Sequence, residues 1–138
     1  MPLTFAPKML SASDIKFDLD ERGWRRASAP EGYTALEEFF VADLQSSTSW
    51  IRDFITKASE IVSGDRKWFE RDGNTCIVDV KPNVTTIDHQ YFETVCTVPT
   101  HVLIEMTRRW QTFVGETEAQ RKTKANKTDQ DDAYKRPC

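Results

Sequence analysis

Residues 67–80 read "KWFERDGNTCIVDV", and this stretch predicts the central hairpin of the fold. Two runs rich in aromatic and β-branched residues flank the polar tip "RDGN" (71–74), whose Asp-Gly and Gly-Asn pairs supply the positive φ angles of tight hairpin turns. Alternation along the second run puts every other residue from Cys76 onward on one face. We therefore expect Asp72 to serve turn geometry and Cys76 to lie in the core.

Further strands are predicted on both sides of this hairpin. The stretch "IKFDL" alternates apolar and polar residues, which is typical of a strand with one buried face. The stretch "LEEFFVADL" is rich in aromatic and β-branched residues and predicts a strand with both faces partly covered. The sequence predicts an α+β fold, mainly an antiparallel sheet of about five to six strands with two main helices packed on it. The predicted strand segments are 14–20, 36–44, 67–70, 75–80 and 84–90, and 23–28 and 92–98 are candidates for further strands.

Two helices are indicated by apolar residues at helical spacing. Residues 46–64 carry an apolar stripe that follows a Ser/Thr-rich N-terminus and ends at Gly64, which suits a left-handed C-cap. A second helix starts after Pro99 and runs to residue 114, just before Gly115. Both helices are expected to pack on the sheet.

Residues 116–138 have a different composition from the rest of the chain. They contain one aromatic residue and no aliphatic residue larger than alanine. Such a segment cannot bury enough apolar surface to offset the entropy lost on ordering. We expect a single α+β domain over 1–115 and a disordered polar tail over 116–138.

Charge and hydropathy restrict the possible functions. Residues 1–115 carry 13 Lys and Arg against 17 Asp and Glu, whereas the tail carries 6 against 5. A mildly acidic domain is not what nucleic-acid binding requires, and it suits a basic protein partner. Because no apolar run approaches the roughly 18 residues of a membrane span, we expect a cytoplasmic protein with no membrane contact.

The sequence contains no motif of a metal site or a known catalytic class. None of Cys76, Cys96 and Cys138 is paired at Cys-x-x-Cys spacing, and there is no glycine-rich phosphate loop. An enzyme would need His89, His101 or Cys96 to converge in one pocket. We expect no catalytic residue, no metal and no cofactor.

Besides an enzyme, the sequence leaves a nucleic-acid-binding module open as an alternative function. The stretches "GWRRAS" and "TRRWQ" set tryptophan beside paired arginines, a combination that binds single strands by stacking and charge. This alternative would use Trp24, Arg25, Arg26, Arg108 and Arg109 on one exposed surface. The preferred interpretation is that the arginines of the last helix form its solvated face.

The order of elements, with the Trp-containing "RKWFERDGN", a short meander and a "VP"-initiated helix ending in "RRWQTFV", resembles small bacterial toxin-immunity proteins. These are the immunity proteins of contact-dependent growth inhibition and polymorphic-toxin systems. The similarity is best over residues 66–114. It implies a non-enzymatic protein that binds a cognate toxin, often a basic nuclease domain, and blocks its active site or substrate groove.

In that interpretation, outward carboxylates meet the Lys and Arg groups with which a nuclease holds phosphates, and an aromatic side chain anchors the contact. No nucleic acid is bound directly. The candidate partner-binding residues are Asp18, Asp20, Glu37, Asp79, Asp88 and Tyr91.

Overall fold

The computed structural model describes the backbone of residues 10–135 and the side chains of residues 10–120. The strands form two antiparallel sheets, β1-β2 and β3-β4-β5-β6. The predicted α+β class is confirmed, but the six strands are divided between two sheets instead of lying mainly in one. In chain order the elements are η1 (Ala12–Asp14), β1 (Lys16–Leu19), β2 (Arg25–Ser28), α1 (Thr34–Glu38), η2 (Phe39–Leu44), α2 (Thr48–Ser63), β3 (Phe69–Asp72), β4 (Cys76–Val80), β5 (Val84–His89), β6 (Thr94–Pro99) and α3 (Thr100–Lys135).

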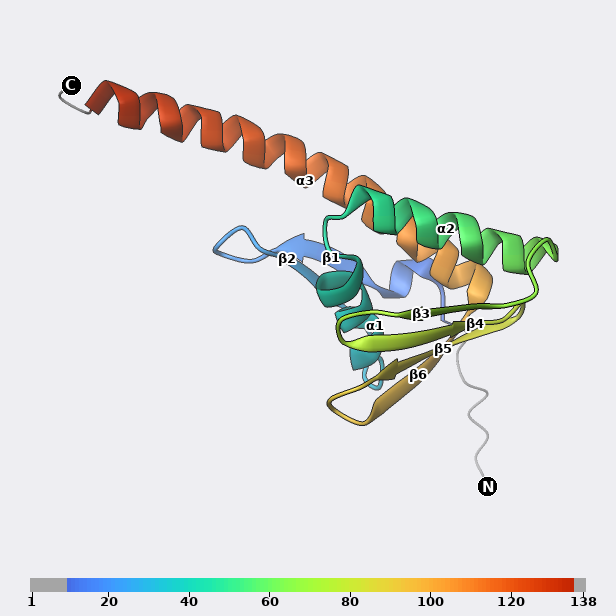
Figure 1. Ribbon diagram of the computed structural model, residues 1–138. Coiled ribbons are helices and arrows are strands. Elements are labelled where there is room, and N and C mark those ends of the chain that lie inside the picture. The colour runs from blue at the N-terminus through green and yellow to red at the C-terminus, as the bar shows by residue number, and fades with distance from the viewer. Residues whose placement is uncertain (1–9, 136–138) are drawn as a thin grey trace.

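The four-stranded sheet is covered on one face only (Figure 1). α1, α2 and α3 pack on its inner face, where alternate residues of β4, β5 and β6 are buried. The intervening residues point to the outer face, over which no element of residues 10–135 lies. One hydrophobic face is enough for an antiparallel sheet, so the outer face is available for polar side chains.

An aromatic cluster fastens the small β1-β2 sheet to the rest of the molecule. The ring of Phe17 lies 5.2 Å from Phe40 and 4.9 Å from Trp110, in both cases edge to face. Such pairs add about 0.5–1.5 kcal/mol to the burial of the rings themselves. The cluster joins β1, η2 and α3 into one core.

The helix predicted over 46–64 is confirmed as α2. The Ser47 hydroxyl accepts a hydrogen bond from the Trp50 N–H at 3.2 Å, and Gly64 ends the helix with φ of 85°. Ile51, Phe54 and Ala58 form part of the buried stripe that faces the sheet and α3.

The strand predicted over 36–44 is wrong, because this segment forms α1 and η2. Leu36, Phe39, Phe40 and Leu44 are all fully buried at helical spacing, whereas Glu37, Glu38 and Val41 between them are not, so a helical period is present behind the β-favouring residues. Short apolar runs cannot be assigned by periodicity alone. η2 is a π-helix that ends at Gln45, whose carbonyl accepts a hydrogen bond from Trp110 Nε1 at 2.8 Å.

The predicted end of the last helix before Gly115 is also wrong, since α3 continues to Lys135 and extends past both sheets (Figure 1). The Arg25 side chain explains the first extra turn, because it donates to Thr117 Oγ1 at 2.8 Å and pairs with Glu118 at 3.1 Å. The disorder expected for 116–138 stays a prediction. Residues 136–138, including Cys138, lie outside the described residues.

Candidate functional site

The outer face of the four-stranded sheet collects acidic side chains in two cross-strand rows. In the first row, Asp72, Ile77, Asp88 and Val95 are successive neighbours across the four strands. In the second row the neighbours are Glu70, Asp79, Thr86 and Thr97. The outward positions of the strands hold four carboxylates and no lysine or arginine. We call Glu70, Asp72, Asp79 and Asp88 the acidic face.

Two of these carboxylates oppose each other directly. Glu70 and Asp79 are register partners on β3 and β4, and like charges in that position destabilise a sheet. Lys81 Nζ lies 3.9 Å from Asp79 Oδ2 and offsets only part of this repulsion, because the pair is exposed. The arrangement costs stability and does not add to it.

An apolar tip lies at the β5-β6 turn, at one end of the sheet. Tyr91 is 67% exposed and Phe92 is 69% exposed. The Phe92 ring lies 4.7 Å from the buried ring of His89, and the Tyr91 N–H donates to His89 Nδ1 at 3.2 Å. The tip therefore presents two large rings on a supported base, beside the exposed Val95 of β6.

A buried carboxylate from η2 holds the neighbouring β3-β4 turn. Asp43, which is fully buried, accepts hydrogen bonds from the Thr75 N–H at 2.7 Å and the Thr75 hydroxyl at 2.9 Å. Its second oxygen accepts from the Cys76 N–H at 2.9 Å and lies 3.9 Å from Arg71 Nη1. This carboxylate satisfies donors that the hairpin itself leaves open.

The positive φ predicted for the 71–74 tip is wrong, since none of these residues has one. Gly73 is required for a different reason. A Cβ atom on Gly73 would lie 2.4 Å from Asp43 Oδ2 and 2.5 Å from Arg71 Nη1. Glycine allows the carboxylate to approach the turn.

The structure places two of the six candidate partner-binding residues, Asp79 and Asp88, on one surface, the acidic face. Tyr91 belongs to the apolar tip, where it contacts the inward-facing His89. Glu70 and Asp72 were not among the candidates. The burial of Phe69 implies that both face outward, and the alternation of "FERD" carries that signal.

The other three candidates lie elsewhere and bind within the chain. Asp18 is the register partner of Arg26 on the β1-β2 sheet and takes both of its guanidinium hydrogen bonds, at 2.9 and 3.0 Å. These hydrogen bonds hold the pKa of Asp18 below its usual value. Asp20 accepts two backbone N–H bonds in the β1-β2 turn. Glu37 of α1 accepts the Ala29 N–H at 2.7 Å.

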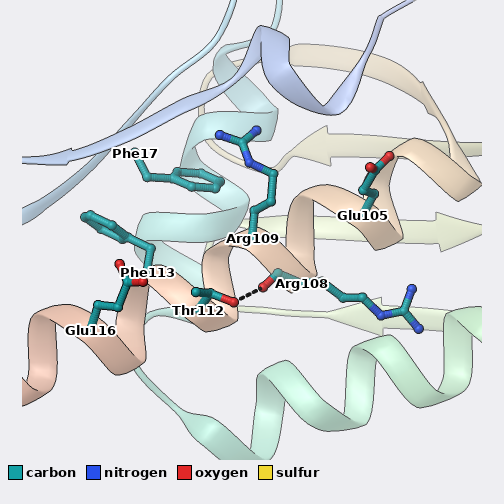
Figure 2. A pocket seen from close by; sticks show the side chains of 7 residues that line it. All are labelled: Phe17, Glu105, Arg108, Arg109, Thr112, Phe113 and Glu116. Carbon is teal, nitrogen blue, oxygen red and sulfur yellow. Dashed lines mark hydrogen bonds between the residues drawn. The ribbon is translucent and has the colours of Figure 1, made fainter.

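Figure 2 shows a groove of about 370 Å³ between β1 and α3. The rings of Phe17 and Phe113 pack together in its wall, with centroids 5.9 Å apart, and the Arg109 guanidinium points toward the segment before β1. There Arg109 donates to the carbonyls of Ala12 and Ile15, and its guanidinium lies 5.6 Å from the Phe17 ring centroid. Arg109 is thus occupied in bracing that segment against α3.

The side chains of the nucleic-acid alternative do not form one free surface. The Arg25 side chain is 9% exposed and bound to α3, and Arg26 is paired with Asp18. Arg108 and Arg109 point in different directions from α3 (Figure 2). Trp24 is exposed in the β1-β2 turn.

The residues of the enzyme alternative do not converge either. His89 and Cys96 are buried on the inner face, whereas His101 is exposed in the first turn of α3. Burial raises the pKa of Cys96 to about 11 and that of Cys76 to about 12, so both remain thiols at neutral pH. No group of three His, Cys, Asp or Glu side chains that could hold a metal ion exists in the described part of the chain.

Comparison with protein-family models, curated proteins and solved structures found no match to this chain. Within residues 10–135, no helix has the length and apolar character needed to cross a membrane.

Proposed function

We propose that this chain is an immunity protein that binds a basic toxin domain on the acidic face of its four-stranded sheet. The observation that carries the proposal is the direct opposition of Glu70 and Asp79 within four outward carboxylates. A charge arrangement that weakens the free protein is expected where a positively charged partner compensates for it. Binding sites commonly accept such a loss of stability in exchange for function.

The supporting chemistry is that of an electrostatically steered interface. Uncompensated carboxylates attract a basic surface and raise its association rate, with a strong dependence on salt. Ile77 in the acidic row offers apolar area among the charges, and the exposed rings of Tyr91 and Phe92 offer more at the end of the sheet. Aromatic anchors next to charged groups are typical of residues that dominate binding energy.

The inhibition that we propose is by occlusion. A nuclease domain holds its substrate through Lys and Arg contacts to phosphates. The acidic face would occupy those groups, and the sheet would cover the substrate groove. No reaction and no cofactor is needed for this mechanism.

Co-expression tests the proposal directly. The toxin domain would be the C-terminal region of a large secreted protein encoded beside this chain. We expect the wild-type chain to restore growth and to co-purify with the toxin domain in a stoichiometric complex. The Asp79→Lys/Asp88→Lys variant is expected to lose protection and to associate at least about tenfold more slowly at low salt.

The matched control is Glu21→Lys/Glu31→Lys, which makes the same change in net charge at exposed positions away from the acidic face. It should protect as well as the wild type. If the wild-type chain gives neither protection nor a complex, the immunity function is wrong. If both double variants behave alike, the toxin binds elsewhere.

A further inference from the structure

The two edge strands of the four-stranded sheet differ in how they are protected. β3 reads "FERD", so three of its four residues are charged, and its edge is guarded against pairing with another strand. β6 reads "TVCTVP" and has no charged residue. Only Pro99, at its end, carries a feature that discourages pairing.

The hydrogen-bond pattern shows which backbone groups of β6 face outward. Gln90 donates to the Thr75 carbonyl and Lys81 donates to the Val84 carbonyl, so even-numbered residues of β5 bond to β4. Odd-numbered residues of β5 therefore bond to the even-numbered residues of β6. The N–H and C=O groups of Val95 and Thr97 point away from the sheet, and within the described residues they have no hydrogen-bond partner.

We propose that β6 pairs with β6 of a second copy of this chain, antiparallel and about a twofold axis at Thr97, to form a continuous eight-stranded sheet. This inference is independent of the immunity function. In this register Thr97 exchanges two hydrogen bonds with its own copy, and each Val95 N–H donates to the Pro99 carbonyl of the other copy. Pro99 lacks an N–H, so in each of these pairs the Val95 carbonyl receives no hydrogen bond from the other copy.

A second copy suits this edge because the arrangement is self-complementary, as a twofold interface must be. Thr97 meets Thr97, a favourable cross-strand pair, and Val95 meets Pro99. The row of Asp72, Ile77, Asp88 and Val95 then continues into the other copy's Pro99, Val84 and Lys81. No carboxylate faces a carboxylate across the join, and Lys81 lies in the row that meets the acidic one.

Light scattering over a concentration series tests the association. One strand pair buries little area and gives a transient dimer, so the series should run from about 1 to about 500 µM. We expect the mass to rise toward twice that of the monomer. Thr97→Pro removes only the outward N–H and should leave a monomer with an unchanged circular-dichroism spectrum, whereas Thr97→Val should still dimerise.

A second pair of variants keeps the test valid if Thr97→Pro does not fold. Val95→Lys places a charge on the paired edge and should abolish the dimer. Phe92→Lys places the same charge on an equally exposed residue of the turn, outside the paired strand, and should leave the dimer intact.

Oxidative cross-linking tests the register in a Cys138→Ser background. Two Thr97→Cys residues would have Cα atoms about 5.5 Å apart, within the range of a disulfide. Thr86→Cys, on the same face and in the same row, would lie about 14 Å from its copy, because three strand spacings separate the two. We expect Thr97→Cys to cross-link at least about tenfold faster. A monomer at every concentration, or equal cross-linking of the two variants, would overturn the proposal.

Discussion

The β3-β4 and β5-β6 hairpins lie side by side in one sheet, yet their turns are stabilised in opposite ways. The β3-β4 turn is clamped from inside by the buried carboxylate of Asp43. In the part of the chain that the structure describes, no buried carboxylate holds the β5-β6 turn: it exposes Tyr91 and Phe92, and His89 Nε2 and Thr94 Oγ1 are buried beneath it without a hydrogen-bond partner. The difference shows that the β3-β4 turn is held by a side chain from another element, whereas the β5-β6 turn leaves two large rings exposed.

Removing the clamp should have the largest effect. Asp43→Ala removes the acceptor of two backbone N–H groups and of the Thr75 hydroxyl. It also removes the carboxylate that lies beside the Arg71 guanidinium. We expect the free energy of unfolding to fall by about 3–5 kcal/mol in urea denaturation.

Asp79→Ala is the control, because it removes a carboxylate from the outer side of the same hairpin. It should be neutral or slightly stabilising, since the repulsion with Glu70 is lost. A loss of less than about 1 kcal/mol for Asp43→Ala would show that the clamp is not needed.

Crowding the clamp should have the next largest effect. Gly73→Ala inserts a methyl group where Asp43 Oδ2 and Arg71 Nη1 already lie, and we expect a loss of about 1–3 kcal/mol. Gly115→Ala is the matched control, because it meets nothing within 4 Å in the interior of α3. It should stabilise by about 0.5–1 kcal/mol. Equal effects in thermal melts would mean that the turn relaxes around the added group.

Thiol labelling compares the two hairpins directly, because each carries one buried cysteine. The pKa of Cys76 is raised to about 12 and that of Cys96 to about 11, so Cys96 has the larger thiolate fraction. In a Cys138→Ser background at pH 8, we expect Cys96 to react with a maleimide at least about tenfold faster than Cys76.

The same shifts set a pH dependence of stability. Both pKa values exceed the unfolded value of 9.0, so the stability from neutral thiols is fully present below pH 9 and falls as the pH rises through 11 to 12. If Cys76 reacted with the maleimide before Cys96, the predicted order of thiol reactivity in the two hairpins would be wrong.

The smallest effect is expected at the opposed carboxylates. Glu70→Lys converts the repulsion with Asp79 into an attraction and should raise the free energy of unfolding by about 0.5 kcal/mol. The same variant should bind a basic toxin domain more slowly. A decrease in stability would remove the main argument for the acidic face.

Much of the local structure could be predicted from the sequence. The limits of α2 follow from Ser47 and Gly64, and the β3-β4 pair follows from alternation around a polar tip. The helical form of 36–44 was missed, although Leu36, Phe39, Phe40 and Leu44 recur at helical spacing, because the run of aromatic and β-branched residues favoured a covered strand.

The sequence predicted only part of the candidate site, because a local pattern shows which way a side chain faces but not which segments lie together. Alternation correctly places Asp79 and Asp88 on the outside of their strands, but it cannot say which outward residues share a surface. Asp18 also faces outward on its strand, yet it belongs to a separate sheet and pairs with Arg26. Glu37 lies on α1, apart from the acidic face, and accepts the Ala29 N–H, a placement that follows from the helical form of its segment.

The sequence by itself determined the α+β class, the periodicity of each confirmed element and the acidic balance of the domain, since these depend on residues close together in the chain. The tertiary structure alone decided that Asp43 closes a turn more than 30 residues later. It also decided that β6 is an unguarded edge. These features arise from contacts between distant segments, and local pattern carries no information about which segments will meet.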